Sequence, residues 1–451
     1  MKINEKSIEK NPTELLKKLD KLHPSDIAYS LKKIIKKNPD DFLFVLKNLP
    51  EDILGDVILE LPEKLREYAY HELTIEKLTD AVDELESDDQ TDILQEIEEL
   101  NVDKAKEIFD GLEVDDQEEI NWLKRYEAGE AGAYMQTELF SANLNETISN
   151  SIEKLRIAKE EKELENIHQV YVVDDNKILV ASILLEDLII FDYKKTYKEL
   201  IEEYGAKRFK PYKVNDDELI KDVAKQFEKY DLSVVAVVGY QNMLIGRITS
   251  DDILDVIEDS ATEQMYQLAG VHDDFEHDSF IFTAKKRAMW LFINLGTAIL
   301  ASMVIGFFDQ TIQAFVALAV LMPIVASMGG NAGTQTLAVM VRRMALGEID
   351  FENSKDAIMK EILVSLLNGV LFALVVGVIT YFWFNTALLG LVIALSMIIN
   401  LFSAGFFGAT IPLFLKKYNI DPAVGSTVLL TTVTDIVGFF SFLMLAKLIL
   451  L

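Results

Sequence analysis

Asp435 is the residue whose surroundings point most directly to chemistry in this chain of 451 residues. It is the only acidic residue of the apolar stretch 428–440, and that stretch contains no basic residue. An ionised carboxylate at the centre of a bilayer costs at least about 2.5 kcal/mol, so it is expected to face a polar cavity or a cation rather than lipid. The arrangement indicates a cation pathway, with a protonated Asp bonded to a neighbouring helix as the alternative.

A second group of polar and small residues lies within the apolar stretch 323–335. It comprises Pro323, Gly329, Gly330, Asn331, Gly333 and Gln335. We expect the proline and glycines to loosen the backbone hydrogen-bond ladder, and freed carbonyls are tolerated at membrane depth only where they are buried in protein or line water. Mg²⁺ takes oxygen ligands and keeps several of its waters. Carbonyls, an Asn amide and one carboxylate therefore suit a hydrated divalent cation, and close helix packing through the glycines is the alternative.

The second half of the chain contains five apolar segments long enough to cross the roughly 30 Å hydrocarbon core as helices. We expect these spans at residues 288–308, 314–340, 362–384, 387–415 and 422–450. Lys and Arg occur before the first span, after the second and after the fourth, whereas the loops 309–313 and 385–386 have none. The positive-inside rule then predicts a cytoplasmic N-terminus and an extracellular C-terminus. The polar start of the chain has no apolar core of a secretory signal, which also predicts a cytoplasmic first half.

Charge divides the chain in the same place. The first 287 residues hold 66 acidic and 37 basic residues, while the rest holds 8 and 7. Such an excess of negative charge repels nucleic acid and attracts cations. There is no cysteine, and the five histidines (His23, His71, His168, His272 and His277) form no zinc motif. Since a P-loop and a nucleophile elbow are also missing from the sequence, we do not expect an enzyme.

The acidic half has two parts with different periodicities. Residues 1–130 contain short amphipathic helical patterns with prolines at the expected helix starts, which predicts a small α-helical solenoid. Its acidic run at 83–89 is expected to be a solvated face. Residues 131–259 alternate strands and helices, with two similar strand–strand–helix units that end at 184–187 and 248–252. This repetition predicts an internal duplication packed face to face.

The second unit ends in Gly-Arg-Ile-Thr-Ser-Asp-Asp at 246–252, which resembles the end of a cystathionine-β-synthase (CBS) domain. The resemblance implies that Gly246, Thr249 and Asp252 hold the ribose and phosphate of a nucleotide such as ATP. The first unit has neither the Gly nor the Thr at 181–187, which argues against nucleotide binding there.

Taken together, the helical region, the CBS pair and five spans with Gly-Gly-Asn-Ala-Gly resemble the MgtE family of magnesium channels. The implied fold class is a multidomain membrane protein, with an all-α transmembrane domain of five helices after an α-helical solenoid-like domain and an α/β tandem CBS pair. The implied domains are residues 1–130, the CBS pair 131–259, a connecting plug helix 260–286 and the pore domain 287–451.

The family's homodimer has its pore between the two copies, mainly along the second and fifth spans. The resemblance implies that Asp435 holds a hydrated Mg²⁺ there, facing Gly329, Gly330, Asn331 and Gly333.

The resemblance also implies regulatory Mg²⁺ bound by acidic residues of the cytosolic domains, which closes the pore. The matching candidates are Asp231, Asp252, Asp255, Glu263 and Asp421, with Asp88 and Asp92 in the helical domain. Ser260 replaces an expected carboxylate, so the adjacent Glu258 and Asp259 are added to the candidates. Gly405 stands where some relatives carry an Asn, which leaves the pore lining by the fourth span open.

We therefore predict a Mg²⁺-selective uptake channel of the cell membrane, a homodimer in contact with lipid and not with nucleic acid, gated by intracellular Mg²⁺. The main alternative is an ion-coupled secondary transporter of divalent cations (Mg²⁺, Co²⁺ or Mn²⁺) that uses Asp435 as a proton or Na⁺ site. A CBS-regulated anion channel fits a buried carboxylate poorly. A membrane-anchored sensing scaffold leaves Asp435 and the Gly-rich span unexplained. Residue types alone do not distinguish Mg²⁺ from Mn²⁺, Co²⁺ or Ca²⁺, since all accept oxygen ligands.

Overall fold

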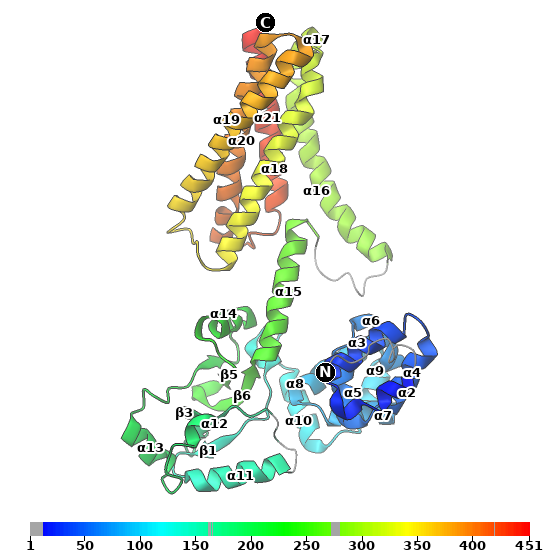
Figure 1. The fold of residues 1–451 in the computed structure, drawn as a ribbon, viewed down its shortest axis with the longest axis vertical. Helices are drawn as coiled ribbons and strands as arrows, with labels where there is room; N and C mark the ends of the chain where they lie inside the picture. The colour runs from blue at the N-terminus through cyan, green and yellow to red at the C-terminus, as the bar shows by residue number, and fades with distance from the viewer. Residues whose placement is uncertain (1–11, 161–163, 165, 272–279, 419) are drawn as a thin grey trace. The chain divides into compact units, whose positions relative to one another are not determined.

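The computed structural model describes residues 12–160, 164, 166–271, 280–418 and 420–451, and it divides into two compact units, 1–260 and 261–451 (Figure 1). His272, His277 and the part of the predicted plug helix at 272–279 lie outside the described residues.

The first unit begins with a two-layer stack of short helices. They are α2 (Pro12–Leu16), η1 (Leu19–Lys21), α3 (Pro24–Ile34), α4 (Pro39–Asn48), α5 (Glu51–Leu59), α6 (Glu63–Glu72), α7 (Ile75–Asp83), α8 (Ser87–Leu100), α9 (Val102–Phe109) and α10 (Val114–Leu123). Helices two apart in sequence pack together, α3 on α5, α5 on α7 and α7 on α9 in one layer and α2 on α4, α4 on α6 and α6 on α8 in the other. This is the stacking of a solenoid, as the sequence predicted.

Sequence chemistry explains where these helices begin. Pro24 and Pro39 occupy the first turns of α3 and α4, where a missing N–H costs nothing. The side chains of Asn38, Thr74 and Asn101 each accept a hydrogen bond from a free backbone N–H at the start of the following helix. The apolar stripes then meet in one continuous core that extends from Leu15 to Ile120. The helical pattern predicted for this region is confirmed.

The rest of the first unit consists of two copies of one small sheet. The first copy contains β1 (Ser141–Asn143), α11 (Ile148–Glu160), β2 (Gln169–Val173), β3 (Leu179–Leu184), α12 (Leu185–Leu188) and α13 (Tyr197–Tyr204). The second contains β4 (Lys213–Asn215), α14 (Ile220–Tyr230), β5 (Val234–Val238), η3 (Tyr240–Asn242), β6 (Leu244–Thr249) and α15 (Ser250–Leu268), with η2 (Ala131–Tyr134) before the first copy. Each sheet pairs its first strand parallel and its last antiparallel to the middle strand, with a register shift at the same position. The predicted duplication is confirmed, and the two copies share a core that includes Tyr171 and Ala236.

The second unit is a bundle of five long apolar helices. They are α16 (Phe280–Gly306), α18 (Ala317–Ala345), α19 (Lys355–Phe384), α20 (Ala387–Lys417) and α21 (Ser426–Leu450), with the short α17 (Asp309–Ala314) after the first. All five are long and apolar enough to cross a membrane, which confirms the five predicted spans. Helix α20 packs against α18, α19 and α21 and is the most buried of the five.

Asn400, in the middle of α20, explains two glycines of the neighbouring helices. Its side chain is completely buried and its amide donates a 2.7 Å hydrogen bond to the carbonyl of Val325 on α18. A Cβ at Gly329 would lie 2.2 Å from the Asn400 nitrogen, and one at Gly438 would lie 2.8 Å from it. Likewise, a Cβ at Gly333 would press on Leu430 of α21 at 3.0 Å.

The expectation of a loosened backbone in the second span is therefore wrong. Helix α18 is continuous from Ala317 to Ala345, because glycine keeps its backbone N–H and Pro323 removes only one bond of the ladder. Two of the signature glycines serve close packing, the alternative that the sequence left open. Gly330 differs, because a Cβ there would have no heavy atom within 4 Å.

This contrast gives a matched pair of variants. We expect Gly329→Ala to destabilise the full-length protein by about 1–3 kcal/mol, since the buried Asn400 cannot move away. The melting temperature in detergent, followed by circular dichroism, should fall by about 2–4 °C per kcal/mol. Gly330→Ala, the control, should melt close to wild type. Equal melting temperatures for the two variants would contradict the packing role.

Candidate functional site

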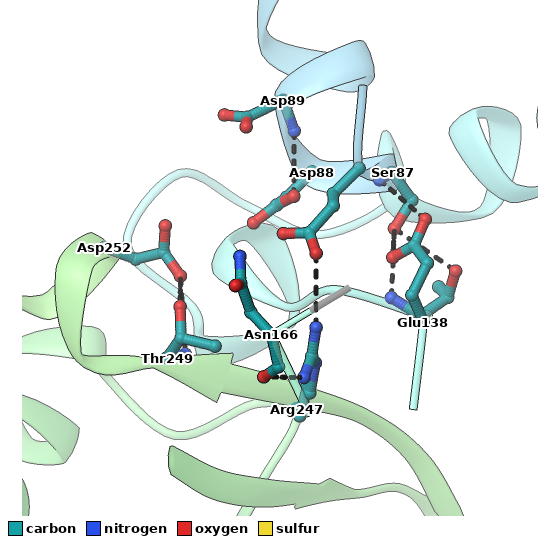
Figure 2. Close-up of polar contacts among 10 residues, drawn as sticks. Ser87, Asp88, Asp89, Glu138, Asn166, Arg247, Thr249 and Asp252 are labelled. Carbon is teal, nitrogen blue, oxygen red and sulfur yellow. Dashed lines mark hydrogen bonds and ion pairs between the residues drawn. The ribbon is translucent and has the colours of Figure 1, made fainter. Parts of the chain in front are cut away.

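Acidic side chains from the helical region and from the second sheet copy meet inside the first unit. Asp88 and Asp89 lie in the first turn of α8, and Asp251 and Asp252 lie in the first turn of α15. Acidic residues are favoured at each helix start by the helix dipole. Bringing the two starts together, however, concentrates like charges in one place, as Figure 2 shows for Asp88, Asp89 and Asp252.

The carboxyl groups of this cluster resist ionisation. Burial first, and then the charges of Asp252 and other neighbours, raise the pKa of Asp89 to about 8. Burial first, and then Asp89 and Asp252, also hold the pKa of Asp88 well above its usual range, and this side chain is only 6% exposed. Burial also raises the pKa of Asp252 to about 6, although the hydroxyl of Thr249 donates a 2.8 Å hydrogen bond to it. The cluster is therefore an electrostatically unfavourable site that a cation would stabilise.

Direct contacts of Ser87 and Glu86 hold α8 in this position. The backbone N–H and hydroxyl of Ser87 donate to the two carboxylate oxygens of Glu138, at 2.9 and 3.0 Å. The guanidinium of Arg247, on β6, lies 3.3 Å from the carboxylate of Glu86 and donates a 3.1 Å hydrogen bond to the carbonyl of Asn166 (Figure 2). Burial raises the pKa of Glu86 to about 7, with Arg247 acting in the opposite direction.

The sequence candidates divide into three groups. After burial, the charge of Asp252 helps to raise the pKa of both Asp88 and Asp92, and Asp255 continues the acidic series along α15 toward Glu258 and Asp259. Asp231 is elsewhere: it is an exposed residue that ends α14 in the left-handed conformation. Glu263 and Asp421 belong to the second unit, where Glu263 accepts a hydrogen bond from Gln267 and Asp421 accepts one from the N–H of Ala423.

Sequence reasoning missed Asp89, Glu138 and Arg247. The acidic run at 83–89 was expected to be a solvated face, which is wrong for the buried Asp88. A charged residue inside an otherwise apolar strand was the available signal for Arg247, since such a side chain is buried only with a partner. Gly246 has a packing role, because a Cβ there would lie 2.8 Å from the sulfur of Met135. Nucleotide binding by Gly246, Thr249 and Asp252 stays a prediction.

Among the described residues, no three His, Cys, Asp or Glu side chains are close enough together to hold a bare metal ion.

The membrane unit carries a separate polar site. Asp435 is half-buried on α21, and Thr427 and Thr431 precede it at intervals of four, on one side of the helix. In the described part of the chain, its carboxylate forms no hydrogen bond or ion pair. On α18, an exposed polar stripe follows the same spacing and contains Ser327, Asn331, Thr334 and Gln335. These polar groups lie at membrane depth and point away from the buried side of α18 that meets Asn400.

The end of α15 contacts the same helices. The hydroxyl of Thr427 donates a 2.8 Å hydrogen bond to the carbonyl of Leu268, the last residue of α15. The Leu268 side chain packs on a cluster that includes Val341 of α18 and Leu430 of α21. A single helix therefore begins beside the acidic cluster and ends on the helices that carry the polar stripes.

Fold and sites together define an integral membrane transport protein with a helical domain and a CBS pair before its five spans. Three family descriptions match: the MgtE intracellular N domain at 22–129, the CBS domain at 202–259 and the MgtE divalent cation transporter at 322–445. One similar relative is the magnesium transporter MgtE of Bacillus subtilis, which is 30% identical over 85% of this chain and 88% of the relative. Another is the magnesium transporter MgtE of Enterococcus faecalis, which is 34% identical over 70% of this chain and 68% of the relative. The chain belongs to the MgtE family of magnesium transporters.

Among solved structures, the cytosolic domain of the Mg²⁺ channel MgtE in complex with ATP is similar. It is 28% identical, with a TM-score of 0.49, over 56% of this chain and 97% of that one.

The raised pKa values of the acidic cluster predict the effect of pH on docking, by which we mean the packing of the helical domain against the CBS pair at this cluster. A carboxyl group whose pKa is raised in the docked state opposes docking when ionised, and this penalty disappears as protons bind. In Mg²⁺-free buffer, docking should therefore strengthen as the pH falls from about 8, the pKa of Asp89 in the docked state, toward the ordinary carboxyl value of about 4, with Glu86 and Asp252 contributing below about 7 and about 6.

Because the chain has no cysteine, Lys106→Cys and Lys198→Cys, both at exposed positions, accept labels for distance measurements. Asp89→Asn should flatten the pH dependence of the distance between the labels. The exposed Asp103→Asn is the control and should leave it unchanged. A distance that grows on acidification would contradict the electrostatic origin of the effect.

Proposed function

We propose that the chain forms a homodimeric Mg²⁺ channel of the cell membrane, with its N-terminus in the cytoplasm, that closes when cytoplasmic Mg²⁺ binds the acidic cluster. The observation that carries the proposal is the coexistence of two carboxylate sites joined by one helix. Asp435 is the only acidic residue of α21, and Asp252, in the first turn of α15, belongs to the acidic cluster around Asp88.

The polar stripe of α18 supports a pore between two copies. Ser327, Asn331, Thr334 and Gln335 are exposed in the single chain, and polar groups in contact with lipid hydrocarbon are costly. A second copy placed over this side would cover them and would bring two Asp435 carboxylates to one water-filled path. Asn331 and Gly330 then belong to the pore side, whereas Gly329 and Gly333 hold α18 against α20 and α21.

The acidic cluster supports gating by Mg²⁺. Burial first, and then neighbouring charges, raises the pKa values of these carboxyl groups, and divalent ions between the first turns of α8 and α15 would offset both effects and favour the docked state. Moving a two-state equilibrium from 1:99 to 99:1 requires about 5.5 kcal/mol of differential binding. Several weakly bound hydrated ions can supply this together, and Asp255, Glu258 and Asp259 extend the series of sites along α15.

Helix α15 supports the coupling between sensor and pore. Asp252 lies in its first turn, and Leu268 at its end meets Thr427, two helical turns before Asp435 on α21. Glu263 and Asp421, near this contact in sequence, are proposed as a second regulatory site. Displacement of α15 by docking at its start would therefore change the contact at the base of the proposed pore.

Transport itself is tested by Asp435→Asn in liposomes loaded with a Mg²⁺ indicator. Loss of the charge should reduce Mg²⁺ influx at least about tenfold, because a hydrogen bond to a charged group contributes about 1.5–3 kcal/mol. Asp356→Asn, at an exposed position at the start of α19, is the control and should retain influx. Wild-type influx in the Asp435→Asn variant would remove the pore role. Influx that requires a proton or Na⁺ gradient would replace the channel by a coupled transporter.

Coupling is tested by Thr427→Val, which removes the hydrogen bond to Leu268 and keeps the size of the side chain. We expect influx at low internal Mg²⁺ to remain near wild type, while inhibition by internal Mg²⁺ shifts to concentrations about 2–10-fold higher, as loss of one neutral hydrogen bond of about 0.5–1.5 kcal/mol implies. Thr410→Val, whose hydroxyl bonds only within α20, is the control. Unchanged inhibition in the Thr427→Val variant would exclude this contact from the gate.

A further inference from the structure

Arg247 is a permanently charged side chain enclosed between the helical domain and the CBS pair. It is 2% exposed and is the largest fully buried side chain of the described residues. Its backbone exchanges two hydrogen bonds with Gln136, at 2.8 and 2.9 Å, which fixes the start of the side chain on β6. Since a guanidinium stays protonated in proteins, burial of Arg247 brings a fixed positive charge to this place at every accessible pH.

The position of this charge matches the local excess of carboxylates. The guanidinium reaches Glu86, the residue immediately before α8, across 161 positions of the sequence. Asp88, Asp89, Glu138 and Asp252 surround the same junction (Figure 2). Arg66, another cation near the cluster, is paired in bidentate fashion with Glu96 inside the helical domain and so does not link the two domains.

The contact of Glu138 with Ser87 shows that the docked state has a second metal-independent anchor. Both carboxylate oxygens of Glu138 are used by the N–H and hydroxyl of Ser87. The Arg247 contact is the complementary one, because it neutralises an acidic residue beside that helix start. Without Arg247, Glu86 would be enclosed among carboxylates with no guanidinium to offset its charge.

We propose that Arg247 is a built-in counterion of this junction, which takes the place of one divalent cation and thereby sets the Mg²⁺ concentration at which the helical domain docks. The inference rests on the proposed Mg²⁺ sensing by the cluster and adds the residue that determines its threshold. With Arg247 present, fewer Mg²⁺ ions are needed, so docking and closure occur at a lower concentration. Its removal makes docking depend on an additional ion.

The test uses the full-length chain with labels at Lys106→Cys and Lys198→Cys, and it follows their distance during a Mg²⁺ titration. Arg247→Leu should raise the Mg²⁺ concentration at the midpoint of the distance change about tenfold, as expected for loss of one coupled ion pair. It should also make the distance change steeper in Mg²⁺ concentration, because docking then requires an additional ion. Arg247→Lys keeps the charge without the planar fork that contacts both Glu86 and Asn166, so it should give an intermediate midpoint. Lys225→Leu removes one positive charge from the exposed surface of α14 and is the matched control.

A double-mutant cycle separates this role from support of the CBS fold. Glu86→Gln, alone and combined with Arg247→Leu, should show midpoints that are clearly non-additive, whereas a purely structural role of Arg247 predicts additive shifts. A midpoint of Arg247→Leu equal to that of wild type, or additive shifts in the cycle, would overturn the inference and leave the proposed sensor intact. A distance that does not respond to Mg²⁺ in any variant would instead overturn the proposed sensor. If Arg247→Leu fails to fold, the test uses the Mg²⁺ titrations of Arg247→Lys and Glu86→Gln. Midpoints equal to that of wild type in both variants would also overturn the inference.

Discussion

The burial of acidic groups where the first turns of α8 and α15 meet is the constraint on which the rest of the first unit depends. Each helix start is locally stable, because its acidic residues face free backbone N–H groups and the positive end of a helix dipole. The cost appears where the two starts meet, because burial first, and then the charges of neighbouring carboxylates, raises the pKa of Asp89 to about 8, of Glu86 to about 7 and of Asp252 to about 6. Because buried carboxylates are costly, any cation that reaches this junction would lower the free energy of the docked state.

The contacts that oppose the repulsion are of two kinds. Glu138 and Arg247 act through fixed geometry, whereas the hydrated cations of the proposed sensor would act in proportion to their concentration. The balance between the two decides whether the junction is a permanent interface or a switch. Too many fixed contacts would hold the domains together without Mg²⁺, and too few would leave them apart at any physiological concentration. One guanidinium among several carboxylates is an intermediate arrangement, as the proposed sensor requires.

Much of the architecture could be predicted from the sequence because its signals are local. Hydropathy located the five spans, prolines and caps located the short helices, and strand periodicity located the duplication. The pairs that build the candidate sensor could not be predicted, since Arg247 and Glu86 are 161 residues apart and Ser87 and Glu138 are 51 apart. The Gly-rich span was misjudged for a different reason. Its glycines predicted a loosened backbone hydrogen-bond ladder, but the role of a glycine in a helix depends on the neighbouring helix that packs against it. The side chain that contacts Gly329 is Asn400, and the one that contacts Gly333 is Leu430.

Asn400 also shows how a buried polar group can organise a membrane bundle without touching an ion. Its amide nitrogen bonds to Val325, while its side-chain oxygen is buried with no hydrogen-bond donor among the described residues. That oxygen lies 2.8 Å and 3.2 Å from the places that side chains would occupy at Gly329 and Gly438, so the Cα–H groups of these glycines point toward it. Such weak contacts contribute about 0.5–1 kcal/mol each. Because Gly438 lies three residues after Asp435, the amide of Asn400 fixes α21 against α18 close to the carboxylate. The polar stripes of these two helices are therefore held in register by a residue that faces away from them.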